Sequence, residues 1–250
     1  MRYNLRDDRG QRRKKGYETM KLFTMSFDDG TTQDRHLVAM MNRHGVRSTF
    51  NLNSGLFSGK CHINHEGVFV RHDKIDAAEV NALYTGHEIA SHTVTHPCLT
   101  NCTTDEVIHQ TKDDCEALKK LCGYEMSGMA YPGGSFFSDE IIRTILDNTP
   151  IRYARTVDST FGFAPPSDFM IWNPTCCCHP SQFDRMNALA DRFIADRSGD
   201  DLLFYVWGHA FELDKFGMWD DLERFLCKIG GREDVRYVTN REAMAYIKSR

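Results

Sequence analysis

The sequence predicts an α/β fold around a parallel sheet, and three observations favour it. Short apolar runs alternate with helical patterns from Lys21 to the carboxyl terminus, as in repeated β/α units. About seven or eight such units favour a barrel, with an open doubly wound sheet as the competing topology. The patterns GxGxxG and GxxxxGK[ST] are absent, so the usual ligand of an open sheet lacks its signature. The 250 residues, 41% of them apolar, suit a single globular domain.

Each predicted strand is a short apolar run that is bounded by polar or glycine-bearing turns. The first run, LFTMSF, follows a charged amino-terminal stretch and ends at two aspartates. In chain order the predicted strands cover residues 22–27, 48–53, 88–91, 129–131, 152–156, 169–172, 202–207 and 235–239. The polar segment 54–75, which carries several histidines, interrupts the alternation, and we expect it to form a loop or a hairpin.

Helices are predicted between most of these strands from apolar spacing and from residues that start and stop helices. The clearest helix, 104–121, opens with a capping box of Thr103 and Glu106 and closes at Gly123. The other predicted helices cover residues 33–44, 76–84, 139–148, 182–197, 219–229 and 241–248.

Charge and terminal composition predict where the protein acts. The formal net charge of −4 gives no basic excess, so we expect neither nucleic acid nor an anionic membrane as a partner. No window approaches the roughly 18 consecutive apolar residues of a membrane helix. The amino terminus lacks the apolar segment of a secretory signal, which predicts a cytoplasmic protein. Residues 1–20 are charged and nearly devoid of aliphatics, so we expect a disordered leader before one domain of residues 21–250.

The nine cysteines form no paired framework, which favours a reduced chain. Cys176, Cys177 and Cys178 are consecutive and could not supply three well-separated ligands without strain. We interpret them as buried structural thiols. A second metal site that uses these thiols and His179 is the alternative.

Two adjacent carboxylates, Asp28 and Asp29, directly follow the strand 22–27. The carboxyl ends of parallel strands are where α/β active sites form. Adjacent residues that leave a strand point in different directions, so one carboxylate can bind a metal while the other reaches a water on that metal. The alternative is an Asp-Asp-Gly turn that caps the next helix.

His92 and His96 are four residues apart, which would place both rings on one face of a helical turn. About half of random chains with this histidine content would contain such a pair, so its spacing alone is weak support. Its position is stronger support, because the pair follows the strand 88–91 and emerges at the same end of the sheet as the two aspartates. A carboxylate with two histidines would leave metal positions open for water and substrate.

Two further groups follow strands at this end. His209, in YVWGHA, could protonate a leaving group, although histidines at strand ends often only bond backbone carbonyls. Tyr131 and Gly133 belong to a glycine-rich turn whose backbone N–H groups could bind an oxyanion, with a plain tight turn as the alternative. Unrelated turns and caps would not be expected to place four such groups at one end of a sheet.

These motifs resemble those of the polysaccharide deacetylase family, which includes chitin and peptidoglycan deacetylases. SFDDG looks like the family's TFDDG motif, which implies that Asp28 is the catalytic base and Asp29 a metal ligand. SHTVTH is similar to the family's H[ST]xxxH-type motif, which implies His92 and His96 as the other ligands. The resemblance spans residue 21 to the carboxyl terminus and implies a distorted TIM-like (β/α) barrel.

The later motifs depart from the family pattern. AYPGG resembles the RxPYG motif, but Ala130 stands where the family has the arginine that braces the catalytic aspartate. Arg155, from the next predicted strand, is our candidate for the missing charge. Asp158 is the candidate for the family's aspartate that orients the catalytic histidine, although no DxxDW pattern is present.

The remaining resemblance concerns the catalytic acid and the substrate. VWGHAFEL resembles the LxxH motif, which implies His209 as the general acid and Trp207 as a lining residue of the substrate groove. Tyr131 and Gly133 are expected to contact the substrate from the AYPGG turn.

The resemblance implies metal-dependent hydrolysis of an acetamide on an N-acetylated sugar or polysaccharide, with release of acetate. We expect a divalent metal, Zn²⁺ first and Co²⁺ or Ni²⁺ as alternatives, and an N-acetylated carbohydrate as the partner. One alternative is a hydrolase of a small non-sugar or cyclic amide on the same scaffold. Another, motivated by Ala130, is a catalytically silent carbohydrate-binding homologue.

Overall fold

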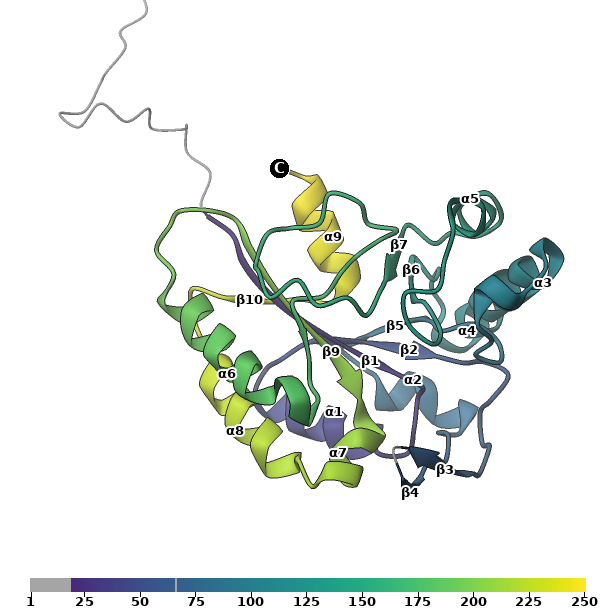
Figure 1. Ribbon diagram of the computed structural model, residues 1–250, viewed down its shortest axis with the longest axis horizontal. Helices are drawn as coiled ribbons and strands as arrows, with labels where there is room; N and C mark the ends of the chain where they lie inside the picture. Colours follow the sequence, from purple (N-terminus) through teal and green to yellow (C-terminus); the bar gives the residue numbers. More distant parts are fainter. Residues whose placement is uncertain (1–18, 66) are drawn as a thin grey trace, which may run out of the picture.

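The computed structural model describes residues 19–65 and 67–250, and within them a curled parallel sheet forms an incomplete barrel with helices outside (Figure 1). The strand order is β7-β6-β5-β2-β1-β9-β8, and β10 pairs with the first residues of β1. The strands are β1 (Lys21–Asp28), β2 (Ser48–Leu52), β5 (Glu88–Ser91), β6 (Gly128–Ala130), β7 (Tyr153–Arg155), β8 (Cys176–Cys177), β9 (Leu202–His209) and β10 (Arg236–Tyr237). All these pairings are parallel, so the predicted α/β barrel-like fold is confirmed.

The central strand β1 shows how the sequence positions the site. Alternate residues of a strand point to opposite faces of the sheet. Phe23, Met25 and Phe27 therefore pack in the large core between the sheet and the outer helices. Leu22 lies in a second, smaller core inside the barrel. The inward-facing series that starts at Leu22 ends at Asp28, which places this carboxylate at the carboxyl end of the barrel interior.

The amino end of the interior is filled by polar side chains and by α9 (Asn240–Lys248). The Asn240 side chain contacts Thr24 at 3.0 Å and donates a hydrogen bond to the Tyr205 hydroxyl at 2.5 Å. The backbone N–H of Asn240 donates to Thr49. These bonds satisfy buried polar groups at the end of the barrel that carries no predicted site residue.

The two edges of the sheet are linked by the segment after β7. Trp172 exchanges backbone hydrogen bonds with Ala154 and Thr156 of the β7 region, and Thr175 donates to the Tyr205 carbonyl of β9. The predicted strand 169–172 is wrong, because only a single bridge between Arg155 and Trp172 forms there. The two-residue strand of this region is β8, which was interpreted from sequence only as a run of thiols.

Most predicted helices are present. They are α1 (Asp34–Arg43), α2 (Val80–Leu83), α3 (Thr104–Ile108), α4 (Asp114–Cys122), α5 (Asp139–Asn148), α6 (Pro180–Ala195), α8 (Trp219–Ile229) and α9. The Thr103 capping box and the left-handed Gly123 at the end of α4 are both confirmed. Sequence reasoning missed α7 (Ala210–Phe216), which begins directly after His209.

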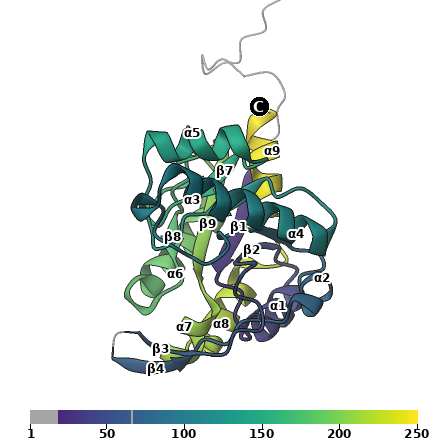
Figure 2. The same ribbon diagram turned by 90° about the vertical axis from the view of Figure 1, so that its right-hand side faces the viewer.

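The predicted insertion 54–75 contains a hairpin of β3 (His62–His65) and β4 (Val68–Arg71), which confirms the hairpin alternative. In both views the hairpin lies beside α7 at the lower edge of the molecule (Figures 1 and 2). It therefore lies next to the carboxyl end of β9, which leads into α7.

The fold begins slightly earlier than predicted. Met20 is buried inside the barrel, and its N–H donates to Asp201 at 2.9 Å, so it belongs to the domain and not to a leader. The rest of the predicted leader, up to residue 18, lies outside the described residues. Among the helices of the part of the chain that the structure describes, none combines the length and apolar composition that a membrane crossing requires.

Candidate active site

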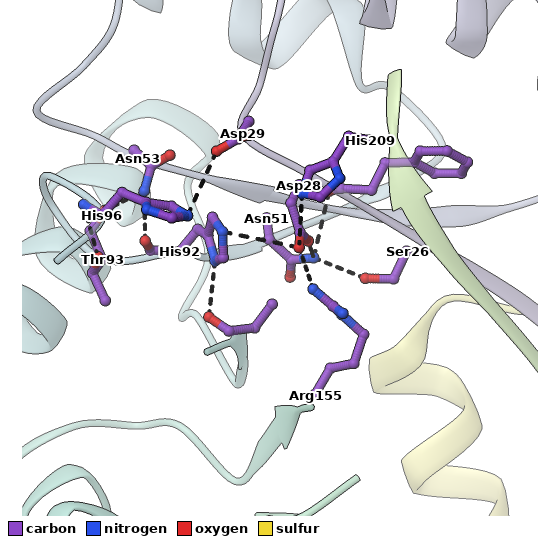
Figure 3. A network of polar contacts seen from close by, with 12 residues as sticks. Ser26, Asp28, Asp29, Asn51, Asn53, His92, Thr93, His96, Arg155 and His209 are labelled. Carbon is purple, nitrogen blue, oxygen red and sulfur yellow. Dashed lines mark hydrogen bonds and ion pairs between the residues drawn. The ribbon is translucent and has the colours of Figure 1, made fainter. Parts of the chain in front are cut away.

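Side chains from four strands converge at the carboxyl ends of the sheet (Figure 3). The strand register brings them together, since Asp28 is paired with Asn51 of β2 on one side and with His209 of β9 on the other. The converging groups are Asp28 and Asp29 after β1, His92 and His96 after β5, Arg155 at the end of β7 and His209 at the end of β9.

Asp29, His92 and His96 form a group with the donor atoms of a metal site. One ligand atom from each residue lies within 4.8 Å of those of the other two. His96 Nε2 is 3.9 Å from Asp29 Oδ1, and the two imidazole rings are 4.7 Å apart at their centres. Two imidazole nitrogens and one carboxylate oxygen are a ligand set that suits Zn²⁺ and leaves a position open for water.

The backbone at these ligands is strained. Asp29, Thr93 and His96 have φ angles of 79°, 68° and 61°, a left-handed conformation that residues other than glycine rarely adopt. The two histidines do not lie on a helical turn as the sequence predicted, since residues 92–98 form a loop. This loop, and not helical periodicity, brings the rings together.

A π-helical turn of residues His109–Asp113, between α3 and α4, holds the histidine loop in place. The Gln110 carbonyl accepts a hydrogen bond from the Val94 N–H, and the Gln110 side chain both accepts from and donates to Thr95. A π-helical turn changes the helical hydrogen-bond pattern locally and is frequent at functional sites. The predicted helix 104–121 is thus interrupted where it supports the loop that carries the candidate metal ligands.

His92 has the tautomer and the charge that a candidate metal ligand requires. Its Nδ1 lies 2.9 Å from the Ala130 carbonyl, which can only accept, so Nδ1 carries the proton and Nε2 presents a lone pair. Burial outweighs the neighbouring carboxylates and lowers the pKa of His92 to about 4, so the ring is neutral near pH 7. The donor set and the protonation state therefore fit a divalent metal ion.

Two residues of the insertion hold Asp29, another candidate ligand. His72 Nε2 donates to Asp29 Oδ2 at 3.1 Å, and Lys74 Nζ lies 3.4 Å from Oδ1. Burial would raise the pKa of Asp29, but the His72 hydrogen bond and the Lys74 charge outweigh it and hold the pKa well below the usual value. Sequence reasoning missed both residues, because nothing in the spacing of segment 54–75 indicates which side chains return to β1.

Asp28 is buried among hydrogen-bond donors and positive charges. Asn51 Nδ2 donates to its Oδ1 at 2.7 Å, and the Arg155 guanidinium donates to its Oδ2. His92 Nε2 and His209 Nε2 lie 3.9 and 4.0 Å from the same Oδ2. Burial would raise the pKa of Asp28, but Arg155 and the two histidines outweigh it and lower the pKa, so this carboxylate is ionised near neutral pH.

Arg155 supplies the positive charge next to Asp28 that Ala130, at the position of the family's arginine, cannot supply. It is only 1% exposed, and its guanidinium carbon lies 4.4 Å from the centre of the Trp207 ring. Trp207 therefore packs against the arginine, and its indole nitrogen is buried. The ion pair joins residues 127 positions apart in the sequence, so only the curl of the sheet brings them into contact.

His209 lies against Glu212, a buried residue one turn further along in α7. The distance from His209 Nδ1 to Glu212 Oε2 is 3.4 Å. Burial would lower the pKa of His209, but Glu212, with smaller contributions from Asp29 and Asp28, raises it to about 9. The imidazole is therefore a cation near neutral pH and can donate a proton from Nε2.

The predicted contact between Asp158 and His209 is not formed. Asp158 is exposed and accepts a hydrogen bond from Ser135 at 2.7 Å. Glu212 occupies the position for which Asp158 was proposed. The spacing of three residues from His209 to Glu212 could have indicated this contact, but only once a helix had been predicted directly after His209.

A sequence model of the polysaccharide deacetylase family matches residues 15–154, which is more than half of the chain. The chain belongs to this family. No curated protein matches it in sequence.

Solved structures of similar fold share little sequence with this polysaccharide deacetylase. The Xyl-CE4 domain of a multidomain xylanase from the hindgut metagenome of Trinervitermes trinervoides has a TM-score of 0.60 and 15% identity, with 92% of both chains covered. A mutant of the peptidoglycan deacetylase PdaC from Bacillus subtilis has a TM-score of 0.56 and 18% identity, covering 94% of this chain and 95% of that one. A CE4 family pseudoenzyme from Bacillus anthracis has a TM-score of 0.52 and 16% identity, covering 91% and 66%. These likenesses establish the fold alone.

The AYPGG turn differs from its predicted role in one respect. The Tyr131 side chain is buried, its hydroxyl donates to the Met170 carbonyl and its backbone N–H donates to the Arg155 carbonyl. Tyr131 is therefore not placed to contact a substrate. Gly133, the exposed member of the turn, has a φ of 72° and remains the candidate for an oxyanion contact.

A cleft of about 430 Å³ opens beside Asp29 and His96 of the candidate metal-binding group. Asp29 and His96 line it on one side, and its apolar wall comes from Leu56, Ile63 and Phe211. The volume is in the range of small-ligand sites. A larger hollow of about 1180 Å³ lies at the amino end of β1, where it is lined by other charged side chains and by no predicted site residue.

Cys176, Cys177 and Cys178 are buried, and burial raises the pKa of each thiol. The His179 ring bonds Ser181 at the start of α6. Buried, protonated thiols are poor metal ligands, so the structural interpretation of this run agrees with its surroundings better than a second metal site does.

Proposed function

We propose that this polysaccharide deacetylase family member hydrolyses the acetamide of an N-acetylated sugar or polysaccharide and releases acetate. Family membership supports deacetylation of a sugar. The observation that carries the assignment of roles is the position of Asp28. This carboxylate is held ionised by Arg155 beside the metal-ligand group and opposite a protonated His209.

Asp29, His92 and His96 would hold a divalent metal, for which Zn²⁺ is our first choice and Co²⁺ or Ni²⁺ are alternatives. A metal bound there would lower the pKa of a water molecule and polarise the amide carbonyl. His72 and Lys74 fix the orientation of the Asp29 carboxylate, and the Ala130 carbonyl fixes the ring of His92.

Asp28 is the base in this proposal. Arg155 and Asn51 hold its carboxylate from two sides, so the side chain does not need to reorient before it accepts a proton from the attacking water. Arg155, with the two histidines, lowers the pKa of Asp28 in spite of burial and keeps it unprotonated in the resting enzyme.

His209 is the acid in this proposal, and Glu212 is its positioning residue. The carboxylate of Glu212 stabilises the imidazolium through Nδ1, which leaves the Nε2 proton for the departing amine. The N–H of Gly133 and its neighbours is the candidate donor for the oxyanion.

The test is acetate release from N-acetylated chitooligosaccharides by the full chain before chelation, after chelation and after return of Zn²⁺, Co²⁺ or Ni²⁺. We expect activity to disappear with the metal and to return with at least one of the ions. Asp28→Asn should lose turnover while it retains the bound metal. Full activity without metal, or in Asp28→Asn, would contradict the proposal. No acetate release under any of these conditions would favour a silent homologue.

A second candidate is the hydrolysis of a small non-sugar amide. The apolar wall that Leu56, Ile63 and Phe211 give to the cleft favours it, because sugars are usually bound through many polar contacts. Parallel assays for acetate, ammonia and ring-opened product on sugar and non-sugar amides distinguish the two candidates. Acetate release from chitooligosaccharides alone would exclude the second.

A further inference from the structure

A second group of metal-binding side chains lies on the outer surface, where the end of α1 meets α8. It consists of His44, Glu223 and Cys227, whose ligand atoms all lie within 4.8 Å of one another. His44 Nε2 is 2.6 Å from Glu223 Oε1 and 3.9 Å from Cys227 Sγ. Helix α1 runs from the carboxyl end of β1 to the amino end of β2, so this group lies at the opposite end of the strands from Asp28.

Local structure explains why the three side chains meet. Glu223 and Cys227 are four residues apart on α8, which places them on one face of the helix. His44 is the residue that ends α1, and 16% of its side chain is exposed. The imidazole is therefore largely enclosed while the thiol remains accessible from solvent.

The distances are close to those of a metal site. With Zn–N near 2.0 Å and Zn–S near 2.3 Å, the ligand atoms of a tetrahedral zinc site lie about 3.3 to 3.6 Å apart. The gap between His44 and Cys227 is near this range, and His44 and Glu223 would need to separate by less than about 1 Å. The Glu223 side chain is 33% exposed, so its rotation can supply this change.

Arg43 orients the carboxylate in the way that an outer partner of a metal ligand does. Its Nη2 donates to Glu223 Oε2 at 2.8 Å, which leaves Oε1 facing His44 and Cys227. A plain surface ion pair would account for Arg43, Glu223 and His44. It gives no reason for a thiol beside the imidazole nitrogen.

We propose that His44, Glu223 and Cys227 form a second metal site, which takes Zn²⁺ and clamps α1 to α8. Binding replaces the proton of the Cys227 thiol by a Zn–S bond and releases that proton to solvent. Binding also replaces the Nε2 proton that His44 donates to Glu223, so the imidazole binds Zn²⁺ as the neutral tautomer that carries its proton on Nδ1. Water fills the remaining position. The site is independent of the catalytic group, because it shares no residue with Asp29, His92 and His96.

Cobalt provides a test that separates the two sites. Metal-free full chain is titrated with Co²⁺, and thiolate coordination is followed by its charge-transfer band in the near ultraviolet. The catalytic group contains no thiol ligand, but Cys61 lines the adjoining cleft, so the band is assigned to the second site by comparing Cys227→Ser with Cys61→Ser. Wild type should show the band, and Cys227→Ser and His44→Asn should lack it. Wild type should also bind one equivalent of Co²⁺ more than either variant. Cys61→Ser, which removes the other exposed cysteine, is the matched control and should behave as wild type.

The same variants supply a second readout. Zn²⁺ should raise the Tm of wild type and of Cys61→Ser further than that of Cys227→Ser, while the three metal-free proteins melt together. Deacetylase activity should be equal in wild type and Cys227→Ser once the catalytic group is loaded. A band that persists in Cys227→Ser, or equal metal stoichiometry in wild type and Cys227→Ser, would overturn the proposal.

Discussion

Asp28 and Glu88 are both buried carboxylates inside the same barrel, but they lie at opposite ends and have different partners. Glu88, at the amino end of β5, accepts hydrogen bonds from the Tyr153 and Thr49 hydroxyls and from the Arg241 backbone N–H. Burial raises its pKa, and these bonds lower it only in part. Asp28, in contrast, has a lowered pKa because Arg155 and two histidines surround it.

The difference shows that burial alone does not identify a catalytic carboxylate. Most donors to Glu88 are neutral, and its one ion pair, with the partly exposed Arg241, does not outweigh burial, so the pKa of this structural carboxylate stays raised. The charged partners of Asp28 keep it ionised in a place where a proton must be accepted. This comparison leads to five predictions, which are given from the largest expected effect to the smallest.

The two carboxylates should respond differently to neutralisation. Asp28→Asn should lower kcat by a factor of about 10² to 10⁴, because it removes the proposed general base. Glu88→Gln keeps the size and most hydrogen bonds of its site, so kcat should stay at the wild-type value. Steady-state kinetics with measured metal content in each variant provides the comparison, and an equal loss in both variants would remove the distinction between the two carboxylates.

Loss of the buried ion pair between Arg155 and Asp28 should lower the free energy of unfolding more than loss of the ion pair between Arg241 and Glu88. Arg155→Met leaves a buried charge without a partner and should lower the free energy of unfolding by about 3 to 5 kcal/mol. Arg241→Met, at a partly exposed arginine, should cost roughly 1 kcal/mol or less through its ion pair. Denaturant unfolding measures both variants. Adding Asp28→Asn to Arg155→Met should restore part of the lost free energy of unfolding. If the two substitutions instead destabilise the protein additively, Arg155 and Asp28 do not form a stabilising ion pair.

Arg155 is also proposed to position Asp28 for catalysis. Arg155→Ala should therefore lower kcat/KM with bound metal retained, and an unchanged kcat/KM would rule out this role.

Glu212 should set the alkaline limit of activity. A general acid must be protonated, so kcat/KM should fall as pH rises through the pKa of His209, which is raised to about 9. Glu212→Gln removes the main stabilising partner of the imidazolium, so the fall of kcat/KM with rising pH should begin at lower pH. At about pH 8 the loss should be about tenfold, and it should shrink at lower pH. Asp158→Asn is the control and should leave the profile unchanged, since Asp158 bonds Ser135.

Glu88 should contribute a small pH dependence to stability. Its folded pKa is raised above the ordinary value of 4.5, so the folded protein binds more protons than the unfolded chain just above that pH. Stability from this group is therefore present below pH 4.5 and is lost as pH rises through the folded pKa. Glu88→Gln should flatten this slope at a cost of about 1 kcal/mol from altered hydrogen bonds. Chemical unfolding between acidic and neutral pH tests the sign.

The sequence predicted the fold well where a pattern is local. Strand β1, helix α1 and the Thr103 capping box each follow from residues that are neighbours in the chain. The strand 169–172 was wrong because residues 169–171 form a turn, in which the Met170 N–H donates to the Asp168 side chain, so only Trp172 forms a bridge with β7. Helix α7 was missed because its start is the end of β9, with no separating turn.

The site residues were also predicted best where the motif is local. The motif SFDDG and the histidine pair indicated Asp28, Asp29, His92 and His96, and the structure places all four side chains together. Their catalytic and ligand roles remain proposals. Asp158 and Tyr131 were chosen from loose motif alignment, and their side chains bond elsewhere.

By itself the sequence determined which residue types follow each strand, because the alternation of strands and helices fixes that order along the chain. Only the tertiary structure decided which of them touch. It placed Arg155 of β7 against Asp28 of β1, His72 of the hairpin against Asp29, and Cys227 against His44. These contacts depend on strand order, register and the curl of the sheet, which couple residues far apart in the chain and leave no trace in local periodicity.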